Sequence, residues 1–183
     1  MILFVCGPSR GGKTSALSEL DDLAPDITVL RASKILRTLK RPLHRLNLSQ
    51  ALENQYILGR WLSRAELRNK KIVVDGHLLI TTTDGPLLVP DSLMSALPIG
   101  GIIFIGDKPE AIFARRSWKS YPKSVDVVRE LSRMERLHAR RLARMLEVPF
   151  VSIADQSKSK LGSRIERMFQ RPLRCAARIK DVF

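Results

Sequence analysis

A glycine-rich loop near the start of the chain constrains the fold more than any other feature of the sequence. The apolar run Ile2–Cys6 leads directly into Gly-Pro-Ser-Arg-Gly-Gly-Lys-Thr at positions 7–14, which matches the Walker A pattern. Glycines let such a loop curl until successive backbone N–H groups point inward, and the N-terminus of a following helix adds positive charge. The pattern therefore predicts a strand, a phosphate-binding loop and a helix over residues 13–20.

The same loop predicts which residues contact a nucleoside triphosphate. Lys13 is expected to reach the β- and γ-phosphates, and the Thr14 hydroxyl is expected to ligate Mg²⁺. The sequence leaves open whether Arg10 touches phosphate or is a solvated loop arginine. A glycine turn without nucleotide is the alternative, which the flanking strand and helix disfavour. The predicted nucleotide-binding residues are Gly7, Pro8, Ser9, Arg10, Gly11, Gly12, Lys13, Thr14 and Ser15.

Apolar runs alternate with helical patterns along the rest of the chain, which is typical of an α/β fold with a mostly parallel sheet. Further strands are expected at 27–30, 72–75, 101–105 and 148–153, and the last two helices at 125–146 and 160–170. Asn47 with Gln50, Asp107 and Ser124 are expected to cap helices. No repeat or boundary interrupts this pattern, so one domain over 1–170 is expected, followed by a basic tail at 171–183.

Composition excludes several classes of protein. With 183 residues, 44% of them hydrophobic, the chain can bury one sizeable core. The cysteines Cys6 and Cys175 are too few for a disulfide framework and are expected to stay reduced. The first apolar run is short for a signal peptide, and no apolar stretch reaches the roughly 18 residues of a membrane span. A cytoplasmic protein without a membrane association is therefore expected.

The net charge of +14 favours polyanionic partners. In the helix expected at 125–146, basic residues recur at steps of three and four along one side. They are Arg129, Arg133, Arg136, Arg140 and Arg144. Another side is expected to face the sheet through Leu131, Met134, His138, Leu142 and Met145. The basic side could be a solvated face or, together with the tail, a surface for nucleic acid.

A second candidate site lies at the end of the apolar run 72–75. Asp75 comes at the carboxyl end of this expected strand, where open α/β sheets bind ligands, and it could hold Mg²⁺ directly or through water. The alternative is a helix cap or turn residue. His77 could orient Asp75 or the metal's waters, and a structural histidine is the alternative.

These motifs, in this order, resemble the archaeal-type adenylate kinases. Besides the Walker A loop, the resemblance rests on Val-Val-Asp-Gly-His-Leu-Leu-Ile-Thr-Thr-Thr-Asp-Gly-Pro-Leu-Leu-Val-Pro at 73–90. It continues through 109–116 with the paired arginines Arg115 and Arg116, and through Met-Glu-Arg at 134–136, where the family has Met-Asn-Arg. It implies a nucleoside monophosphate kinase-like fold of the P-loop NTPases, a three-layer sandwich around a five-stranded parallel sheet, with ATP and Mg²⁺ as ligands.

The resemblance also implies roles for individual residues. Lys13, Asp75, Arg115 and Arg116 would serve catalysis, with Thr14 and Asp75 on the metal. The acceptor would bind at about 31–68, a segment that contains Arg37, Arg41 and Arg45, of which Arg45 is favoured. Gln55 could read an acceptor base or be hydrogen-bonded locally, and Arg136 is a candidate phosphate contact.

The chain departs from the family at the lid, which is expected at about 115–124. The family continues from the paired arginines into an aspartate and further arginines, whereas this chain has Ser-Trp-Lys-Ser-Tyr-Pro-Lys at 117–123. Lys119 and Lys123 keep positive charge but cannot form the bidentate clamps of arginine. AMP as the acceptor therefore does not follow from the resemblance.

Three functions remain open on the sequence. The leading one is an ATP-dependent kinase of a nucleoside monophosphate. The second is a nucleotide-dependent protein that uses its basic face to hold nucleic acid or an acidic protein. The third is a kinase that acts on a nucleic-acid end or a non-nucleotide alcohol, which needs a general base, and Asp75 is the well-placed candidate.

Overall fold

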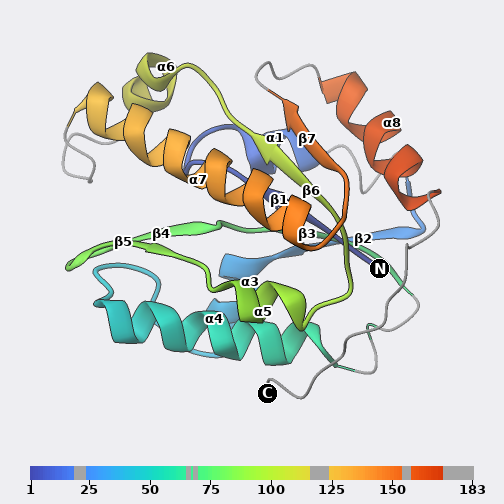
Figure 1. The fold of residues 1–183 in the computed structure, drawn as a ribbon, viewed down its shortest axis with the longest axis horizontal. Coiled ribbons are helices and arrows are strands. Elements are labelled where there is room, and N and C mark those ends of the chain that lie inside the picture. The colour runs from blue at the N-terminus through green and yellow to red at the C-terminus, as the bar shows by residue number, and fades with distance from the viewer. Residues whose placement is uncertain (19–23, 65–66, 68–69, 116–123, 154–157, 171–183) are drawn as a thin grey trace.

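The computed structural model describes residues 1–18, 24–64, 67, 70–115, 124–153 and 158–170 (Figure 1). Its centre is a five-stranded sheet with the strand order β2-β3-β1-β6-β7, in which every neighbouring pair is parallel. These strands are β1 (Ile2–Cys6), β2 (Ile27–Arg31), β3 (Lys71–Asp75), β6 (Ile99–Ile105) and β7 (Phe150–Ile153). The sheet confirms the predicted α/β class and number of strands.

The fully apolar run at the start of the chain forms the middle strand. All five residues of β1 are buried, because β3 and β6 flank the strand and helices cover both of its faces. Its register against β3 pairs Val5 with Asp75. The ends of the two strands are therefore level, and the loop that follows β1 begins beside the Asp75 carboxylate.

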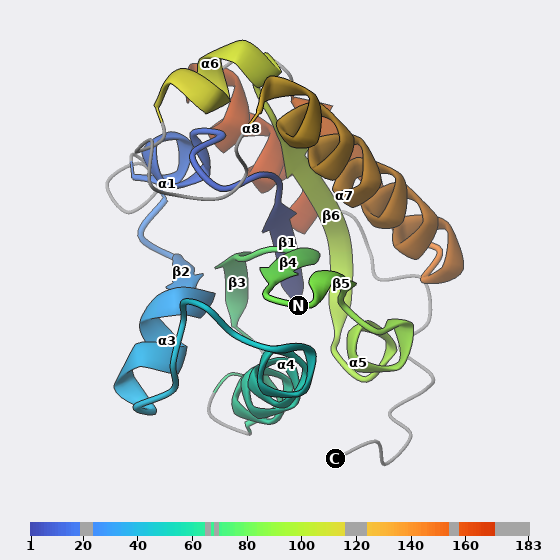
Figure 2. The same cartoon turned by 90° about the vertical axis from the view of Figure 1, so that its left-hand side faces the viewer.

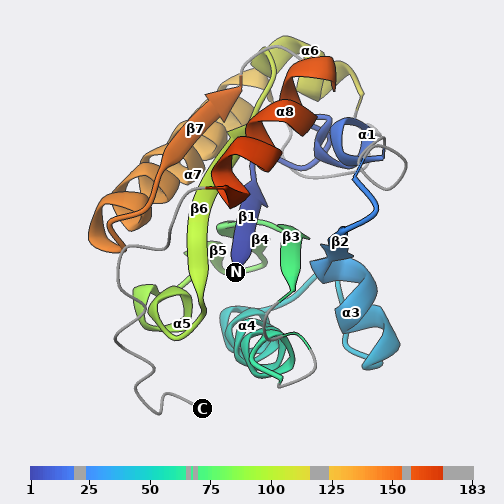
Figure 3. The ribbon, with the colours of Figure 1, turned by 90° about the vertical axis from the view of Figure 1, so that its right-hand side faces the viewer.

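Two layers of helices cover the sheet. The cluster on one face holds apolar residues of α3 (Ala32–Thr38), α4 (Leu48–Leu62), α5 (Asp91–Ser95) and α7 (Val125–Met145). The other cluster holds those of α1 (Lys13–Leu17) and α8 (Lys158–Phe169). Figures 2 and 3 show α7 and α8 on opposite sides of β6. The predicted three-layer sandwich is confirmed.

A short hairpin that the sequence pattern did not predict lies outside the main sheet. It joins β4 (Leu79–Thr82) and β5 (Gly85–Leu88), which are antiparallel. Its tip contacts the start of α4: Thr83 N donates to Leu46 O at 2.8 Å, and Asp84 Oδ2 accepts from Leu48 N at 2.9 Å. The hairpin therefore fixes the segment that precedes α4.

Two of the three predicted helix caps are present, and the third is not. The capping box of Asn47 and Gln50 is present at α4, and the Ser124 hydroxyl accepts from Val127 N at the start of α7. Asp107 as a cap was wrong, because α6 (Pro109–Ala114) has Lys108 at its N-cap position. Pro109 opens that helix, and its fixed φ suits the first turn without a side-chain cap.

Some further predictions concern the exposure of side chains on α7, and others concern residues that the structure does not describe. The five arginines predicted to share one side of α7 are all exposed, as expected. Met145 was expected to face the sheet but is 43% exposed, because it lies at the end of the helix.

Several predicted features lie outside the described residues: Arg116, Cys175, nearly all of the expected lid and the tail at 171–183. No helix in the described part of the chain is long and apolar enough to cross a membrane.

Candidate functional site: the glycine-rich loop and its surroundings

The glycine-rich loop at 7–12, which the sequence predicts to be a phosphate loop, connects β1 to α1 at the carboxyl edge of the sheet. Gly7 has a φ of +139°, and a Cβ at this position would stand 1.9 Å from Ile105 O, so the close pass beside β6 requires glycine. Gly12 has a φ of +89° at the N-cap position of α1. The predicted loop therefore has the tight, glycine-dependent backbone that the sequence pattern indicated.

Lys13 is the first residue of α1 and folds back over the loop. Its side chain is buried, and Nζ donates to Gly7 O at 2.6 Å and to Pro8 O at 3.1 Å. Burial lowers the pKa of the Lys13 ammonium, while the nearby carboxylates of Glu135 and Asp75 act in the opposite direction. Two loop carbonyls thus accept hydrogen bonds from the ammonium group.

The next residue joins the loop to β3. Thr14 Oγ1 donates to Asp75 Oδ2 at 3.0 Å. A hydroxyl and a carboxylate at this separation suit Mg²⁺, which needs few protein ligands when phosphates and waters complete its shell. In the described part of the chain no three His, Cys, Asp or Glu side chains gather closely enough to hold a metal ion. The pair fits a Mg²⁺ that arrives with a nucleotide.

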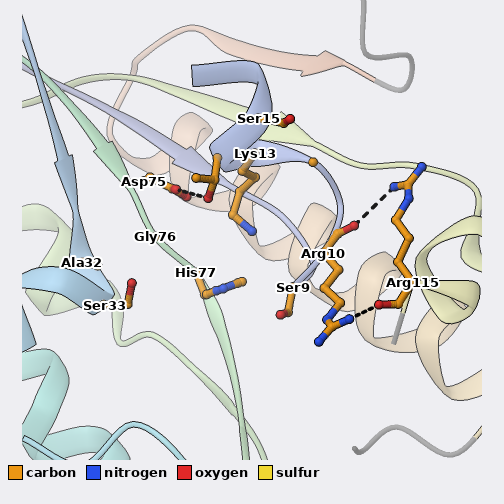
Figure 4. Close-up of a pocket in the computed structure, with 12 residues that line it drawn as sticks. Ser9, Arg10, Lys13, Ser15, Ala32, Ser33, Asp75, Gly76, His77 and Arg115 are labelled. Atoms are coloured by element: carbon orange, nitrogen blue, oxygen red, sulfur yellow. Dashed lines mark hydrogen bonds between the residues drawn. The ribbon is translucent and has the colours of Figure 1, made fainter. Parts of the chain in front are cut away.

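A cavity of about 580 Å³ opens in front of these residues (Figure 4). The loop and α1 contribute half of its lining, and Figure 4 shows the side chains of Lys13 and His77 pointing into the same space. Asp75 supplies the only carboxylate of the described lining, against three basic side chains, so the cavity favours an anionic ligand. The lining comprises Ser9, Arg10, Gly12, Lys13, Thr14, Ser15, Ala32, Ser33, Asp75, Gly76, His77 and Arg115.

The two arginines of the described lining each donate a hydrogen bond to the other's backbone carbonyl. The Arg10 guanidinium donates to Arg115 O, and Arg115 Nη1 donates to Arg10 O at 3.3 Å. Arg115 also pairs with Asp107 at 2.7 Å. The residue predicted for catalysis at 115 thus lies beside the phosphate loop, and Arg10 faces the cavity rather than bulk solvent alone. Arg116 lies outside the described residues.

Glu135 on α7 is a residue of this site that the sequence prediction missed. The residue is 2% exposed, and its Oε1 accepts from Gly7 N at 3.2 Å and from Leu78 N at 2.9 Å. His77 Nδ1 lies 3.7 Å from the same oxygen. Burial would raise the pKa of Glu135, but His77, Lys13 and the Leu78 N–H outweigh it, and the pKa is lowered.

A signal for Glu135 was present in the sequence. It lies seven residues after Val128 and seven before Leu142, both buried, so its side chain emerges on the apolar side of the helix. A carboxylate on that side requires buried partners, and this requirement points to a polar site beneath the helix.

The residues predicted to bind the acceptor do not line the cavity. Arg45 is exposed in the loop before α4, with a φ of +51°, while Gln55 is half-buried on α4 and Arg136 is exposed on α7. Their roles stay predictions. Arg41, which was weighed beside Arg45, is held elsewhere: its Nε donates to Asn54 Oδ1 at 2.9 Å, and it pairs with Glu53.

Comparisons with known proteins support the fold of the chain. No protein-family model matches it, and no curated protein matches it in sequence. Among solved structures, a shikimate kinase from Acinetobacter baumannii in complex with shikimate is similar at a TM-score of 0.62. The match covers 92% of each chain at 13% identity. The fold is thus that of the P-loop, nucleoside monophosphate kinase-like proteins, and the narrower resemblance to archaeal-type adenylate kinases stays a prediction.

Proposed function

We propose that this protein is an ATP- and Mg²⁺-dependent phosphotransferase whose acceptor is a nucleoside monophosphate. The observation that carries the proposal is the meeting of Lys13, the Thr14–Asp75 pair and Arg115 around one cavity. These groups come from three separate segments of the chain, and each has a use in phosphoryl transfer. The similarity to a shikimate kinase supports a small-molecule kinase in general terms.

The chemistry follows from charge and position. The Lys13 ammonium exchanges its loop carbonyls for phosphate oxygens, and the Arg115 guanidinium adds positive charge beside the transferring group, together with Arg116. Thr14 and Asp75 hold Mg²⁺, which neutralises phosphate charge. Because these groups orient the nucleotide and compensate its charge, catalysis is mainly positioning and electrostatic stabilisation.

A phosphate acceptor suits this lining better than an alcohol. An acceptor that is already a phosphate needs no protein base, whereas an alcohol must lose a proton during attack. The one carboxylate of the described lining, Asp75, already accepts a hydrogen bond from Thr14. Arg45, Gln55 and Arg136 remain proposed contacts of this acceptor.

The test is a transfer assay with a panel of acceptors. Purified protein is incubated with Mg²⁺-ATP and ribo- or deoxyribonucleoside monophosphates, and diphosphates are separated by chromatography. Formation of diphosphate from one or a few acceptors is expected, and Lys13→Ala should abolish it. The matched control is Lys71→Ala, because Lys71 is exposed at the opposite end of β3 and pairs with Asp26. Turnover by a folded Lys13→Ala variant would contradict the assignment.

A second function has support from the charges of α7. Arg129 pairs with Glu110 and Asp126, and Arg133 pairs with Glu130. Within the described part of the chain, no carboxylate pairs with Arg136, Arg140 or Arg144. This unpaired stripe suits a polyanion such as nucleic acid, whose binding the nucleotide would then control. ATP binding without transfer to any acceptor would favour this second function.

A further inference from the structure

Glu135 is a buried charge between two segments that line the cavity. Through Oε1 it accepts the N–H of Gly7, the first residue of the phosphate loop, and the N–H of Leu78, which follows His77. These contacts span 128 and 57 positions of the sequence. One carboxylate on α7 therefore connects the phosphate loop to the segment that carries Asp75 and His77.

The negative charge of Glu135 is also close to positive charge. A buried carboxylate loses its hydration, and hydrogen bonds and nearby positive charges must replace it. The two N–H groups satisfy only part of its hydrogen-bonding capacity. The buried Lys13 ammonium carries the opposite charge, and Gly7 lies between the two groups: its N–H donates to Glu135 and its carbonyl accepts from Lys13. His77 Nδ1, 3.7 Å from the same carboxylate oxygen, is a second partner. The two loop carbonyls that accept from Lys13 Nζ carry no net charge, so the attraction to Glu135 stabilises the position of the ammonium group.

Binding of a nucleotide would change how the charges of Lys13 and Glu135 are compensated. Its phosphates bring several negative charges to the loop and would take over the compensation of Lys13. Glu135 then lies behind a loop that holds anions, and its charge opposes theirs at short range in a low-dielectric surrounding. The carboxylate therefore stabilises the nucleotide-free site and disfavours the nucleotide-bound one.

We propose that Glu135 is a positioning residue that holds the Gly7 amide in the phosphate loop and whose negative charge weakens nucleotide binding. The inference rests on the proposed function only in requiring that the cavity binds a nucleotide. A purely structural Glu135 would behave differently: its replacement would lower the stability of the protein and its nucleotide affinity together. The proposal requires the two quantities to change in opposite directions.

The test uses Glu135→Gln, which keeps the shape and one acceptor oxygen but removes the charge. Affinities for Mg²⁺-ADP and Mg²⁺-ATP are measured by titration calorimetry, and the stability of the nucleotide-free protein by thermal unfolding. Glu135→Gln should bind both nucleotides about three- to tenfold more tightly and should unfold at a lower temperature. Glu135→Ala also loses the acceptor for Gly7 N and should bind more weakly than Glu135→Gln. Glu130→Gln is the matched control, because Glu130 lies exposed on the same helix.

The outcomes separate this inference from the proposed function. Equal or weaker binding by Glu135→Gln, with normal binding by the wild-type protein, overturns the inference alone. A wild-type protein that binds neither nucleotide overturns the proposed function and the inference with it.

Should Glu135→Gln fail to fold, the compensation of Lys13 by Glu135 is tested in a Lys13→Met background, where the opposite charge is already absent. There the protein with Glu135→Gln should fold, because no buried ammonium is left without its counter-charge. A double variant that also fails to fold would contradict the compensation and overturn the inference.

Discussion

The Thr14 hydroxyl donates a 3.0 Å hydrogen bond to Asp75 Oδ2, across 61 positions of the sequence. The contact exists because β1 and β3 are neighbours with Val5 opposite Asp75, so the residues after β1 meet the end of β3. The fold itself thus brings together two side chains suited to Mg²⁺, and preorganisation of this kind lowers the cost of binding.

The first prediction concerns this pair. Asp75→Asn keeps the size of the side chain and its acceptor oxygen, so the contact with Thr14 should persist, but the charge that attracts Mg²⁺ is lost. Turnover should fall by roughly 100-fold, and a higher Mg²⁺ concentration should be needed for half-maximal rate. The measurement is the initial rate over a Mg²⁺ titration, with Asp26→Asn as the exposed control. An unaltered Mg²⁺ dependence in Asp75→Asn would remove Asp75 from the metal site.

The second prediction concerns Arg115. Its side chain contacts Asp107 and Arg10 O beside the cavity, so its charge is held near the place proposed for the transferring group. Arg115→Ala should lower kcat by about 100- to 1000-fold, with a smaller effect on the KM for ATP. Arg115→Lys should recover only part of the loss, because an ammonium cannot reproduce the guanidinium geometry. Arg167→Ala, exposed on α8, is the control in steady-state assays, and full activity of Arg115→Ala would refute the role.

The third prediction concerns the pH dependence of stability through His138. This buried ring contacts Val89 O through Nε2 at 2.8 Å and the Arg141 guanidinium through Nδ1 at 3.1 Å. Since a carbonyl only accepts and a guanidinium only donates, Nε2 carries the proton and Nδ1 has none. Burial lowers the pKa of His138, and the charge of Arg141 adds to this.

The sign of the pH effect follows from that lowered pKa. Above the unfolded pKa of about 6.5, the ring is neutral in both states and its stabilisation is fully present. As the pH falls from there through the lower folded pKa, the unfolded state binds more protons, and this contribution is lost. Thermal unfolding between pH 7.5 and 5 should show a smaller pH dependence in His138→Gln than in the wild-type protein. His44→Gln, at an exposed histidine, is the matched control, and identical curves for His138→Gln and the wild-type protein would contradict the prediction.

The fourth prediction tests the unpaired stripe of α7. Arg140→Gln with Arg144→Gln should weaken binding of a single-stranded oligonucleotide and reduce the slope of log affinity against log salt by about 2. Arg129→Gln with Arg133→Gln removes the same charge from arginines that are already paired, so the slope should change less. The measurement is fluorescence anisotropy over a salt series. Equal effects of the two double variants would show that the stripe has no special role.

Much of the fold was predictable because its signals are local. An apolar run, a glycine-rich loop and a helix within residues 1–17 specify β1, the phosphate loop and α1. The capping box at Asn47 and the Ser124 cap likewise depend on residues three positions apart. The hairpin of β4 and β5 was missed because its strands are only four residues long and its tip contacts α4, far away in sequence.

In the candidate site, too, some features follow from local sequence patterns and others depend on packing between distant segments. The sequence by itself determined the phosphate loop, with Lys13 and Thr14, and the position of Asp75 at a strand end, since these follow from spacing and hydrophobic periodicity. Only the tertiary structure decided that Thr14 meets Asp75, that Glu135 lies beneath Gly7, and which arginines of α7 have carboxylate partners. The physical reason is that these contacts depend on strand register and on the rotation of α7 against the sheet. Both are set by packing between distant segments, which local patterns do not specify.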